Sequence, residues 1–327
     1  MSRVRIGVLG AARIAPAAIV EPARVCSEAE LVGIAARDRD RANAFAAKHG
    51  VPHVFDSYAD LLADPGIDAI YNPLPNGLHA EWTIAALEAG KHVLCEKPFT
   101  SNTQEAEEVA AVADRTGLVA MEAFHYRYHP LADRMRALVE DGELGALEHV
   151  EAALCFPLPK FSDIRYQYHL GGGATMDVGT YTVHLARLLG LEEPSVASAT
   201  AKLRAPDVDR AMTAQLTFPS GHTGRITCSM WSSDVLKAFV RVRGSRGELY
   251  VINPTNPQVW HRFRVTIDGV GHTERFSRRP TYEFQLDAFT AAVLRGSPTL
   301  TPPPDSIANM RVLDAIYVAA GMRPRGT

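Results

Sequence analysis

Short apolar runs and longer stretches of helical period alternate through the first third of the chain. They fall at residues 4–9, 14–25, 31–35, 39–49, 53–55, 58–62, 69–72, 79–89, 92–95, about 101–116 and 118–122. Short apolar runs are typical of buried strands, whereas apolar residues that recur every three or four positions predict helices. Strands that alternate with helices favour a parallel sheet. We therefore expect an α/β domain with a doubly wound parallel sheet over residues 1–122.

From residue 147 onward the pattern changes, because strand-like runs follow one another with few helices between them. These runs fall at residues 147–156, 196–204, 212–218, 223–230, 236–243 and 259–267. Within 238–243, Ala and Val alternate with Phe and Arg, the pattern of a sheet with one covered and one open face. We expect a C-terminal α+β domain over residues 123–327 on an open-faced, mostly antiparallel sheet. Helices at 176–189, 283–294 and about 305–321 are available to cover it, and the last is also a candidate to pack back on the first domain.

Composition narrows the class of protein. The 327 residues carry 34 basic and 37 acidic side chains, a formal net charge of −3, and 46% of them are hydrophobic. The length suits two cores, and a near-neutral charge without a basic stripe gives no attraction to nucleic acid or to an anionic membrane. No run reaches the roughly 18 apolar residues of a membrane span, and the start of the chain has no signal-peptide pattern. We expect a cytoplasmic protein that binds neither nucleic acid nor membranes.

The cysteines add a second exclusion. Cys26, Cys95, Cys155 and Cys228 lie far apart, with no CxxC pair among them. Such spacing fits reduced thiols better than a disulfide framework or a zinc site. We therefore expect no metal.

The segment after the first predicted strand is a candidate nucleotide-binding turn. A dinucleotide-binding turn carries glycine at its first, third and sixth positions, and of these only Gly10 is glycine here, with Ala12 and Ala15 at the others. Alanine still permits a fairly close approach of a pyrophosphate, and the following helix N-terminus attracts an anion. We expect a dinucleotide to contact Gly10, Ala12, Arg13 and Ile14. The alternative is a tight turn that binds no ligand.

The end of the second predicted strand indicates which dinucleotide is bound. NAD-preferring sites carry an acidic residue there for the ribose 2′-hydroxyl, but this chain has Arg37, followed by Arg41. A guanidinium can bind a 2′-phosphate through two hydrogen bonds, whereas a carboxylate would repel it. Arg37, helped by Arg41, therefore favours NADP, with NAD possible. The alternative is a solvated charge run at the start of a helix.

Four further segments carry a resemblance to a known family. They are residues 71–76 (YNPLPN) with His79, 95–98 (CEKP), 121–130 (MEAFHYRYHP) and 171–181 (GGGATMDVGTY). Through them the chain resembles the Gfo/Idh/MocA oxidoreductase family nearly end to end. The last two segments are similar to the subgroup of dimeric dihydrodiol dehydrogenases, NADP-dependent xylose dehydrogenases and glucose-fructose oxidoreductase. The resemblance implies a Rossmann domain that holds NADP and hydride transfer to or from a sugar, anhydro-sugar or diol carbon.

The resemblance also implies the catalytic residues. It places Lys97 beside the nicotinamide and the reacting oxygen, where an ammonium can polarise a carbonyl or stabilise an alkoxide. Tyr181 stands where many members carry histidine and is the expected proton donor, although a phenol needs a nearby cation to lower its pKa before it can act as a base. Asp177, four residues earlier, would share a helix face with it and orient either partner. The alternatives are a surface lysine, a helix-start aspartate and a core tyrosine.

Further site residues are expected from the same motifs. Glu96 is expected to orient Lys97 or the nicotinamide ribose, and a cis peptide bond is expected before Pro98. Tyr71, Pro73, Asn76 and His79 are expected along the cofactor edge. Arg127 and Arg165 are candidates for substrate or cofactor contacts, with structural salt bridges an equal alternative. An amphipathic pocket could be lined by Phe156, Phe161, Tyr126 and Tyr166, which could equally be core.

Three functions and one assembly remain to be compared. The leading hypothesis is a catalytic NADP-dependent dehydrogenase or reductase. The second is a non-catalytic NAD(P)-binding regulator, which the intact Lys97, Asp177 and Tyr181 disfavour, and the third is a methyltransferase, which would have no use for the Lys97 motif. The sequence does not choose among sugars and diols or set the direction of reaction. Exposed Phe239, Trp231 and Trp260 on the open sheet face predict a homodimer through that face.

Overall fold

The computed structural model describes residues 3–327, which divide into two compact units. The first contains the described residues up to Thr100 together with Gln104–Tyr128 and Pro280–Ser306. The second contains Ser101–Thr103, His129–Arg279 and Ile307–Thr327. Along the chain, the main change from the first unit to the second falls after Tyr128. The domain boundary after residue 122 stays a prediction. A late segment, 280–306, returns to the first unit.

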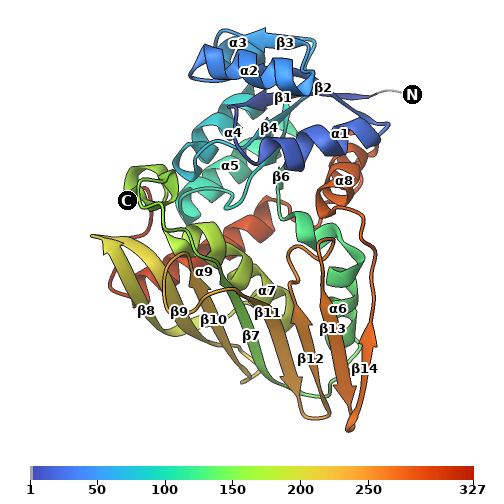
Figure 1. Ribbon diagram of the computed structural model, residues 1–327, viewed down its shortest axis with the longest axis vertical. Coiled ribbons are helices and arrows are strands. Elements are labelled where there is room, and N and C mark those ends of the chain that lie inside the picture. The colour runs from blue at the N-terminus through green and yellow to red at the C-terminus, as the bar shows by residue number, and fades with distance from the viewer. Residues whose placement is uncertain (1–2) are drawn as a thin grey trace. The chain divides into compact units, whose positions relative to one another are not determined.

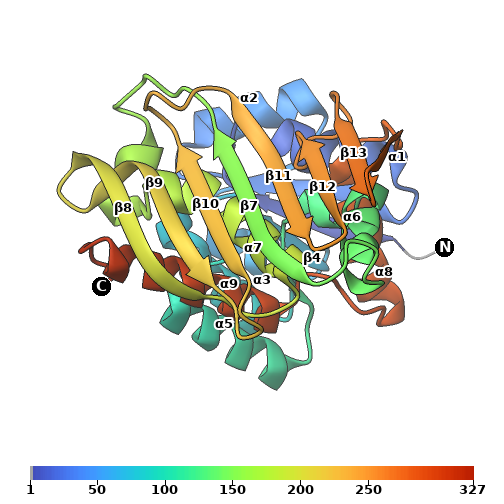
Figure 2. The same cartoon turned by 90° about the horizontal axis from the view of Figure 1, so that it is seen from below.

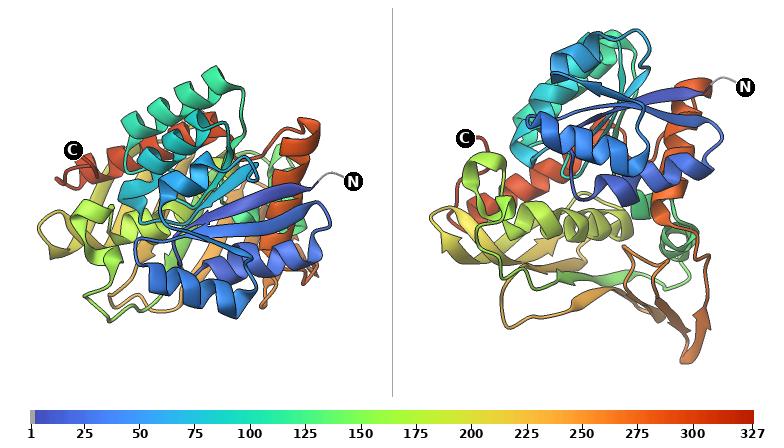
Figure 3. Two further views of the ribbon diagram at one scale, coloured as in Figure 1. Left: turned by 90° about the horizontal axis from the view of Figure 1, so that it is seen from above. Right: turned by 45° about the horizontal axis from the view of Figure 1, so that its top comes forward.

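The first unit is built on a six-stranded parallel sheet with strand order β3-β2-β1-β4-β5-β6. The strands are β1 (Val4–Leu9), β2 (Ala29–Ala35), β3 (His53–Phe55), β4 (Ala69–Asn72), β5 (His92–Cys95) and β6 (Ala120–Glu122). Helices lie on both faces of this sheet (Figures 1 and 3): α1 (Glu21–Val25), α2 (Arg39–His49), α3 (Tyr58–Ala63), α4 (His79–Glu88), α5 (Thr103–Thr116) and α8 (Thr281–Arg295). Because both faces are covered, the strands are rich in apolar residues, although each carries a polar residue such as Arg5, Glu30 or Asn72. The predicted doubly wound fold is confirmed.

The second unit is built on an eight-stranded sheet with strand order β14-β13-β12-β11-β7-β10-β9-β8. The strands are β7 (Leu147–Cys155), β8 (Ser195–Ala205), β9 (Val208–Thr217), β10 (Thr223–Ser229), β11 (Lys237–Gly244), β12 (Gly247–Ile252), β13 (Arg262–Ile267) and β14 (Val270–Glu274). All neighbours pair antiparallel except β7 and β10, which run parallel. The predicted mostly antiparallel sheet is confirmed.

One face of this second sheet is covered by helices and the other is open. Helix α7 (Thr180–Gly190) packs on β7 and β10, and α6 (Pro130–Glu140) packs on α7. Val240 and Val242 are buried, whereas Arg241 on the other face is only partly covered. Figure 2 shows the open face, with no helix of the second unit in front of it. The alternation of apolar and polar residues along β11 predicted this correctly.

Two of the helices assigned to this sheet from sequence behave differently. Helix α8 packs on α1, β1 and the short helix η3 (His125–Tyr128) of the first unit, so the prediction that it covers the second sheet is wrong. Both sheets offer an apolar face to an amphipathic helix, and the periodicity of the helix does not choose between them. Helix α9 (Pro303–Ala319) bonds within the second unit, where Asn309 donates to Thr180 and Tyr317 to Asp209. Its candidate packing on the first domain stays a prediction.

Two expectations concern features that residues 3–327 do not show. No helix in this range is long and apolar enough to cross a membrane. No group of three or more histidine, cysteine, aspartate or glutamate side chains in it is arranged to hold a metal ion. All four cysteines carry free thiols.

Candidate functional site

The turn after β1 has the geometry of a close-approach turn. Gly10 has φ +85°, and its N–H donates to Ala35 O at 2.6 Å at the end of β2. A Cβ on Gly10 would lie 3.1 Å from the Leu74 side chain, so glycine suits both the backbone conformation and the space. The helix that follows begins at Pro16 with a π-helical turn (Pro16–Val20), whereas Ile14 is exposed beside the turn. The turn thus presents backbone and one apolar side chain on its open side.

The arginines after β2 differ in whether their guanidinium groups already bind other residues of the chain. Asp38 caps α2 by accepting the N–H of Arg41 at 3.1 Å, and the Arg41 guanidinium donates to Ala11 O at 3.2 Å. Arg39 pairs with Asp56. Within residues 3–327, the exposed guanidinium of Arg37 forms no ion pair or side-chain hydrogen bond. Arg41 therefore holds the turn after β1 in place, and Arg37 is the charge left available for a ligand.

Lys97 follows β5 at the carboxyl edge of the parallel sheet, where open α/β sheets bind ligands. Among residues 93–100 Lys97 is the one that is not buried. Its neighbour Glu96 accepts a hydrogen bond from the Tyr71 hydroxyl at 2.8 Å and one from the Lys97 N–H at 3.3 Å. The peptide bond between Lys97 and Pro98 is cis, as expected. A buried loop thus presents one ammonium, with one carboxylate beside it.

His79 holds this loop from inside. Its Nδ1 lies 2.8 Å from Pro98 O and its Nε2 lies 2.7 Å from Leu74 O. Both contacts favour the charged ring, but complete burial outweighs them, and with the charge of Lys97 it lowers the pKa of His79 to about 4. His79 is therefore a neutral, fully buried side chain that ties the loop after β5 to the loop after β4. A contact with the cofactor edge stays a prediction for it, as for Asn76 and Pro73.

A second buried histidine near Lys97 was not found from the sequence. His125 bonds through Nδ1 to the Thr281 hydroxyl at 2.7 Å, and its ring packs on Tyr282 with centroids 4.1 Å apart. Burial, with a smaller contribution from the charge of Lys97, lowers the pKa of His125 to about 3. Burial, with a smaller contribution from Glu96, raises the pKa of Tyr282. Both partners come from α8, so no local signal could have identified them.

Two predicted substrate residues of the first unit are buried. Tyr126 is fully buried, and its ring meets Phe124 edge-on with centroids 6.3 Å apart. Arg127 is 4% exposed, and its N–H donates to Phe124 O. Substrate contacts by Tyr126 and Arg127 stay predictions, since both side chains lie in the core of this unit.

In the second unit, Asp177 is an accessible residue in a buried segment, as Lys97 is in the first unit. Among residues 171–187 Asp177 is the one that is not buried. Its Oδ2 lies 3.1 Å from Arg165 Nε, and Arg165 Nη1 lies 3.1 Å from Oδ1 of the buried Asp163. Asp177 first, and Asp163 after it, raises the pKa of Arg165. The salt-bridge alternative for Arg165 is therefore realised, and the pair still reaches solvent.

The segment that carries Asp177 and Tyr181 differs from the expected single helix. Asp177 lies in a π-helical turn (Thr175–Gly179), and Tyr181 lies at the start of α7. A π-helix is wider than an α-helix and has more residues per turn, so the stretch from Asp177 to Tyr181 crosses a change of helix type. Tyr181 is 8% exposed. The expected single helix is thus corrected to a π-helical turn followed by α7, and the common face of Asp177 and Tyr181 stays a prediction.

An aromatic cluster lies beside this segment in the second unit. Phe161 packs on Tyr166 with centroids 5.4 Å apart and meets Trp231 edge-on at 6.1 Å, and the Arg204 guanidinium lies 4.7 Å from the Phe161 ring centre. The Tyr166 hydroxyl donates to Leu158 O, and burial raises its pKa to about 12. Phe156 is half-buried at the end of β7. Trp231 and Arg204 complete a group that the sequence showed only as Phe161 and Tyr166.

Comparison with known proteins decides the family. The model of an oxidoreductase family with an NAD-binding Rossmann fold, GFO/IDH/MocA, matches residues 4–124, and the model of the GFO/IDH/MocA C-terminal domain matches residues 132–250. D-xylose 1-dehydrogenase (NADP(+)) 2 of Haloferax volcanii is 39% identical over 96% of each chain. The chain belongs to the Gfo/Idh/MocA oxidoreductase family. The resemblance seen in its four motifs is thereby confirmed.

Other members extend the comparison. A dTDP-3,4-didehydro-2,6-dideoxy-alpha-D-glucose 3-reductase of Actinomadura kijaniata is 35% identical over 97% of this chain and 96% of its own. A solved structure of a 3-ketoreductase from Actinomadura kijaniata with NADP and TDP-benzene is 31% identical, with a TM-score of 0.90 over 98% of both chains. An aldose-aldose oxidoreductase from Caulobacter crescentus with glycerol is 26% identical, also with a TM-score of 0.90 over 98% of both chains. These Gfo/Idh/MocA members are named as enzymes, which favours the catalytic hypothesis over the regulatory one.

Proposed function

We propose that this chain is an NADP-dependent oxidoreductase that transfers hydride between a nicotinamide and a sugar, anhydro-sugar or diol carbon. The observation that carries the proposal is the end of β5 and the loop after it, residues 93–100, where seven buried residues flank the half-buried Lys97 at the ligand-binding edge of the sheet. A lysine kept accessible in an otherwise buried loop is available for chemistry on a bound molecule.

The residues of the first unit fit a dinucleotide with a 2′-phosphate. Gly10 leaves room for a pyrophosphate, and the available guanidinium of Arg37 follows β2, where the 2′-substituent is recognised in Rossmann domains. Ala12, Arg13, Ile14, Tyr71, Pro73, Asn76, His79 and Glu96 complete the proposed cofactor set. The bound nicotinamide supplies or accepts the hydride.

Lys97, Tyr181 and Asp177 are proposed as the catalytic residues. In the direction of reduction, the oxygen of a substrate carbonyl would gain negative charge and then a proton. The Lys97 ammonium would stabilise this oxyanion, and the Tyr181 hydroxyl would donate its proton to it. Asp177, paired with Arg165, orients the polar groups of the substrate.

Variants of the Actinomadura 3-ketoreductase support these two assignments. Structures of that protein with NADP and TDP-benzene include one with a lysine replaced by alanine and one with a tyrosine replaced by phenylalanine. The two replaced residues are separated in that chain by the same number of positions as Lys97 and Tyr181 in this one. A lysine and a tyrosine at the same separation were thus chosen for replacement in a relative.

A cofactor-and-substrate screen tests the function. NADP+ reduction is followed over pentoses, hexoses, myo-inositol and trans-diols, and NADPH oxidation over dicarbonyls and anhydrofructose. The proposal expects turnover with at least one polyhydroxylated substrate, and enhanced NADPH fluorescence on binding. Tight NADPH binding without turnover of any compound would favour the regulatory protein instead. Binding of S-adenosylmethionine in place of NADPH would favour the methyltransferase.

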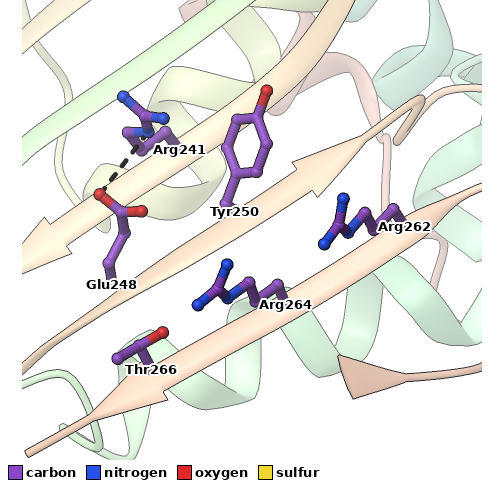
Figure 4. Close-up of a pocket in the computed structure, with 6 residues that line it drawn as sticks. All are labelled: Arg241, Glu248, Tyr250, Arg262, Arg264 and Thr266. Carbon is purple, nitrogen blue, oxygen red and sulfur yellow. Dashed lines mark ion pairs between the residues drawn. The ribbon is translucent and has the colours of Figure 1, made fainter. Parts of the chain in front are cut away.

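We also propose that two copies associate through the open face of the second sheet, but the chemistry of that face differs from the predicted apolar patch. Trp231 and Trp260 are exposed, yet across β11, β12 and β13 the face carries a shallow hollow lined by polar and charged side chains (Figure 4): Arg241, Glu248, Tyr250, Arg262, Arg264 and Thr266. Arg241 faces Glu248 at 3.6 Å within this hollow. In a symmetric dimer the same patch appears on both copies, so arginines of one can meet Glu248 of the other.

The mass in solution tests the dimer. Light scattering is expected to give twice the 35.6 kDa of one chain, and Arg264→Glu, which reverses a charge in the hollow, is expected to shift the mass toward one chain. A wild-type mass near that of one chain would reject the dimer. A cytoplasmic location, proposed from the dispersed free thiols, is tested by cell fractionation.

A further inference from the structure

The C-terminal tail of the chain reaches into the second unit through one arginine. Arg325 and Asp209 are both fully buried, and Arg325 Nη2 lies 3.0 Å from Asp209 Oδ1. The guanidinium lies over the ring of Tyr317 at 4.1 Å, and Asn102 donates to the backbone carbonyl of Arg325 at 2.8 Å. Arg325, the third residue from the end of the sequence, is therefore held from several sides.

This ion pair contacts the backbone on both sides of Gly173. Arg325 Nε donates to Gly172 O at 2.6 Å. Asp209 Oδ2 accepts the N–H and the hydroxyl of Thr175, each at 2.7 Å. The two charged side chains thus hold residues 172–175 through backbone atoms of Gly172 and Thr175. Removal of either charge should therefore alter the conformation of this segment before that of others.

Gly173 shows how closely the pair approaches. Its φ is +138°, a conformation that side chains rarely adopt. A Cβ at this position would collide with Asp209 Oδ1 and would lie 2.7 Å from Arg325 Nη2 and 3.0 Å from the Tyr317 hydroxyl. The glycine is required because the ion pair lies directly against the chain.

One residue, Gly173, links this segment to the candidate site. The Gly173 N–H donates to Arg165 O at 2.8 Å, and the Asp177 N–H donates to Gly173 O at 3.0 Å. Arg165 and Asp177 are the ion pair that reaches solvent. The fully buried pair and the half-buried pair are therefore coupled through the backbone of Gly173.

We propose that Arg325 and Asp209 are positioning residues, which hold residues 172–175 so that Asp177 and Tyr181 take their working orientation. The inference rests on the proposed function, because it assigns the pair a role in that reaction. A buried ion pair contributes little net stability compared with apolar residues of the same size, since desolvation offsets the attraction. Its value here is the fixed backbone geometry on which the site residues stand, and small displacements of such residues reduce turnover strongly.

The test compares Arg325→Ala with Arg323→Ala. Arg323 lies in the same tail but pairs at the surface with Asp207, so it is a matched control. Arg325→Ala is expected to lower kcat by about tenfold or more with little change in the Kd for NADPH. Its amide protons over residues 173–177 are expected to exchange about tenfold or more faster. Millimolar guanidinium is expected to restore part of the turnover, and Arg323→Ala to behave as wild type.

Milder variants cover a failure of Arg325→Ala to fold. Tyr317→Phe removes one donor to Asp209, and Arg325→Lys cannot reach Gly172 and Asp209 together in the same geometry, so both should show the same two effects in smaller degree. Wild-type exchange with wild-type kcat, or faster exchange at 173–177 with unchanged kcat, would overturn the proposal. Failure of the proposed function has a separate sign: the wild-type chain turns over no substrate, while the exchange comparison still reports whether the pair holds the segment.

Discussion

The two segments that present accessible polar groups are held by opposite chemistry. Around Lys97 in the first unit, the buried supports His79 and His125 are neutral, and both have lowered pKa values to which the charge of Lys97 contributes. Around Asp177 in the second unit, the supports are ion pairs, with Arg165 on one side and the buried pair of Arg325 and Asp209 behind. The two neutral histidines add no positive charge of their own beside the Lys97 ammonium, whereas ion pairs fix geometry through charge. The neutral surroundings of histidine suit Lys97, which is proposed to act through its charge. The ion pairs suit Asp177 and Tyr181, which are proposed to act through their orientation.

The largest effect is expected at Lys97, whose two supporting histidines are neutral. Lys97→Met removes the ammonium that stabilises the reacting oxygen, so kcat should fall by about a hundredfold or more. NADPH binding, measured by fluorescence titration, should change little. Lys48→Met, at an exposed position of α2, serves as the control and should keep full turnover. Full turnover in Lys97→Met would remove the lysine from the mechanism.

The neutral state of His79 can be tested by pH. Its pKa in the folded chain, about 4, lies below the ordinary value of 6.5, so the unfolded chain binds a proton first as the pH falls. The stabilisation is complete above pH 6.5 and is lost as the pH falls through about 4, by about 3 kcal/mol in the free energy of unfolding at 1.36 kcal/mol per unit.

The measurement is denaturant unfolding of wild type and His79→Gln at pH 7 and pH 4. The variant should lose about 3 kcal/mol less than wild type between these values, because glutamine does not titrate. His53→Gln, at an exposed histidine of the first unit, should lose as much as wild type. Equal losses in wild type and His79→Gln would contradict a neutral His79.

In the second unit, Tyr181→Phe separates proton transfer from positioning. Loss of the hydroxyl should lower kcat by about tenfold to a hundredfold while the melting temperature stays near that of wild type. Tyr250→Phe, on the open sheet face, should leave kcat unchanged. A fully active Tyr181→Phe would transfer the proton step to Lys97 alone.

A smaller effect is expected at the cofactor end of the first unit. Arg37→Ala should raise the KM for NADPH by about tenfold, the value of one or two charged hydrogen bonds, and leave the KM for NADH almost unchanged. Arg39→Ala is the matched control, because Arg39 pairs with Asp56. Equal changes for both cofactors would refute the assignment of Arg37 to the 2′-phosphate.

The sequence predicted what depends on local pattern. Alternating apolar runs gave the parallel sheet of the first unit, and the alternation along β11 gave the covered and open faces of the second. Arg37 could be singled out because it follows a predicted strand, and Lys97 because its motif resembles that of a known family and also follows a predicted strand. These features need only short-range spacing and the rule that parallel strands bring their carboxyl ends to one edge.

What the sequence left hidden depends on contacts between distant residues. The partners of His125 come from α8, and Asp209 meets Arg325 across more than a hundred positions. Neither pairing has a periodic signal, because any of the 34 basic side chains could pair with any of the 37 acidic ones. The π-helical turn before α7 was also not predicted, because the same residues are compatible with an α-helix.

The most direct test is a crystal structure of the chain with NADP+ and a small polyol such as glycerol. The account predicts the Lys97 amine within hydrogen-bond reach, about 2.6–3.2 Å, of a polyol hydroxyl whose carbon lies about 3–3.5 Å from C4 of the nicotinamide. An amine directed to bulk solvent, with the nicotinamide bound elsewhere, would contradict it.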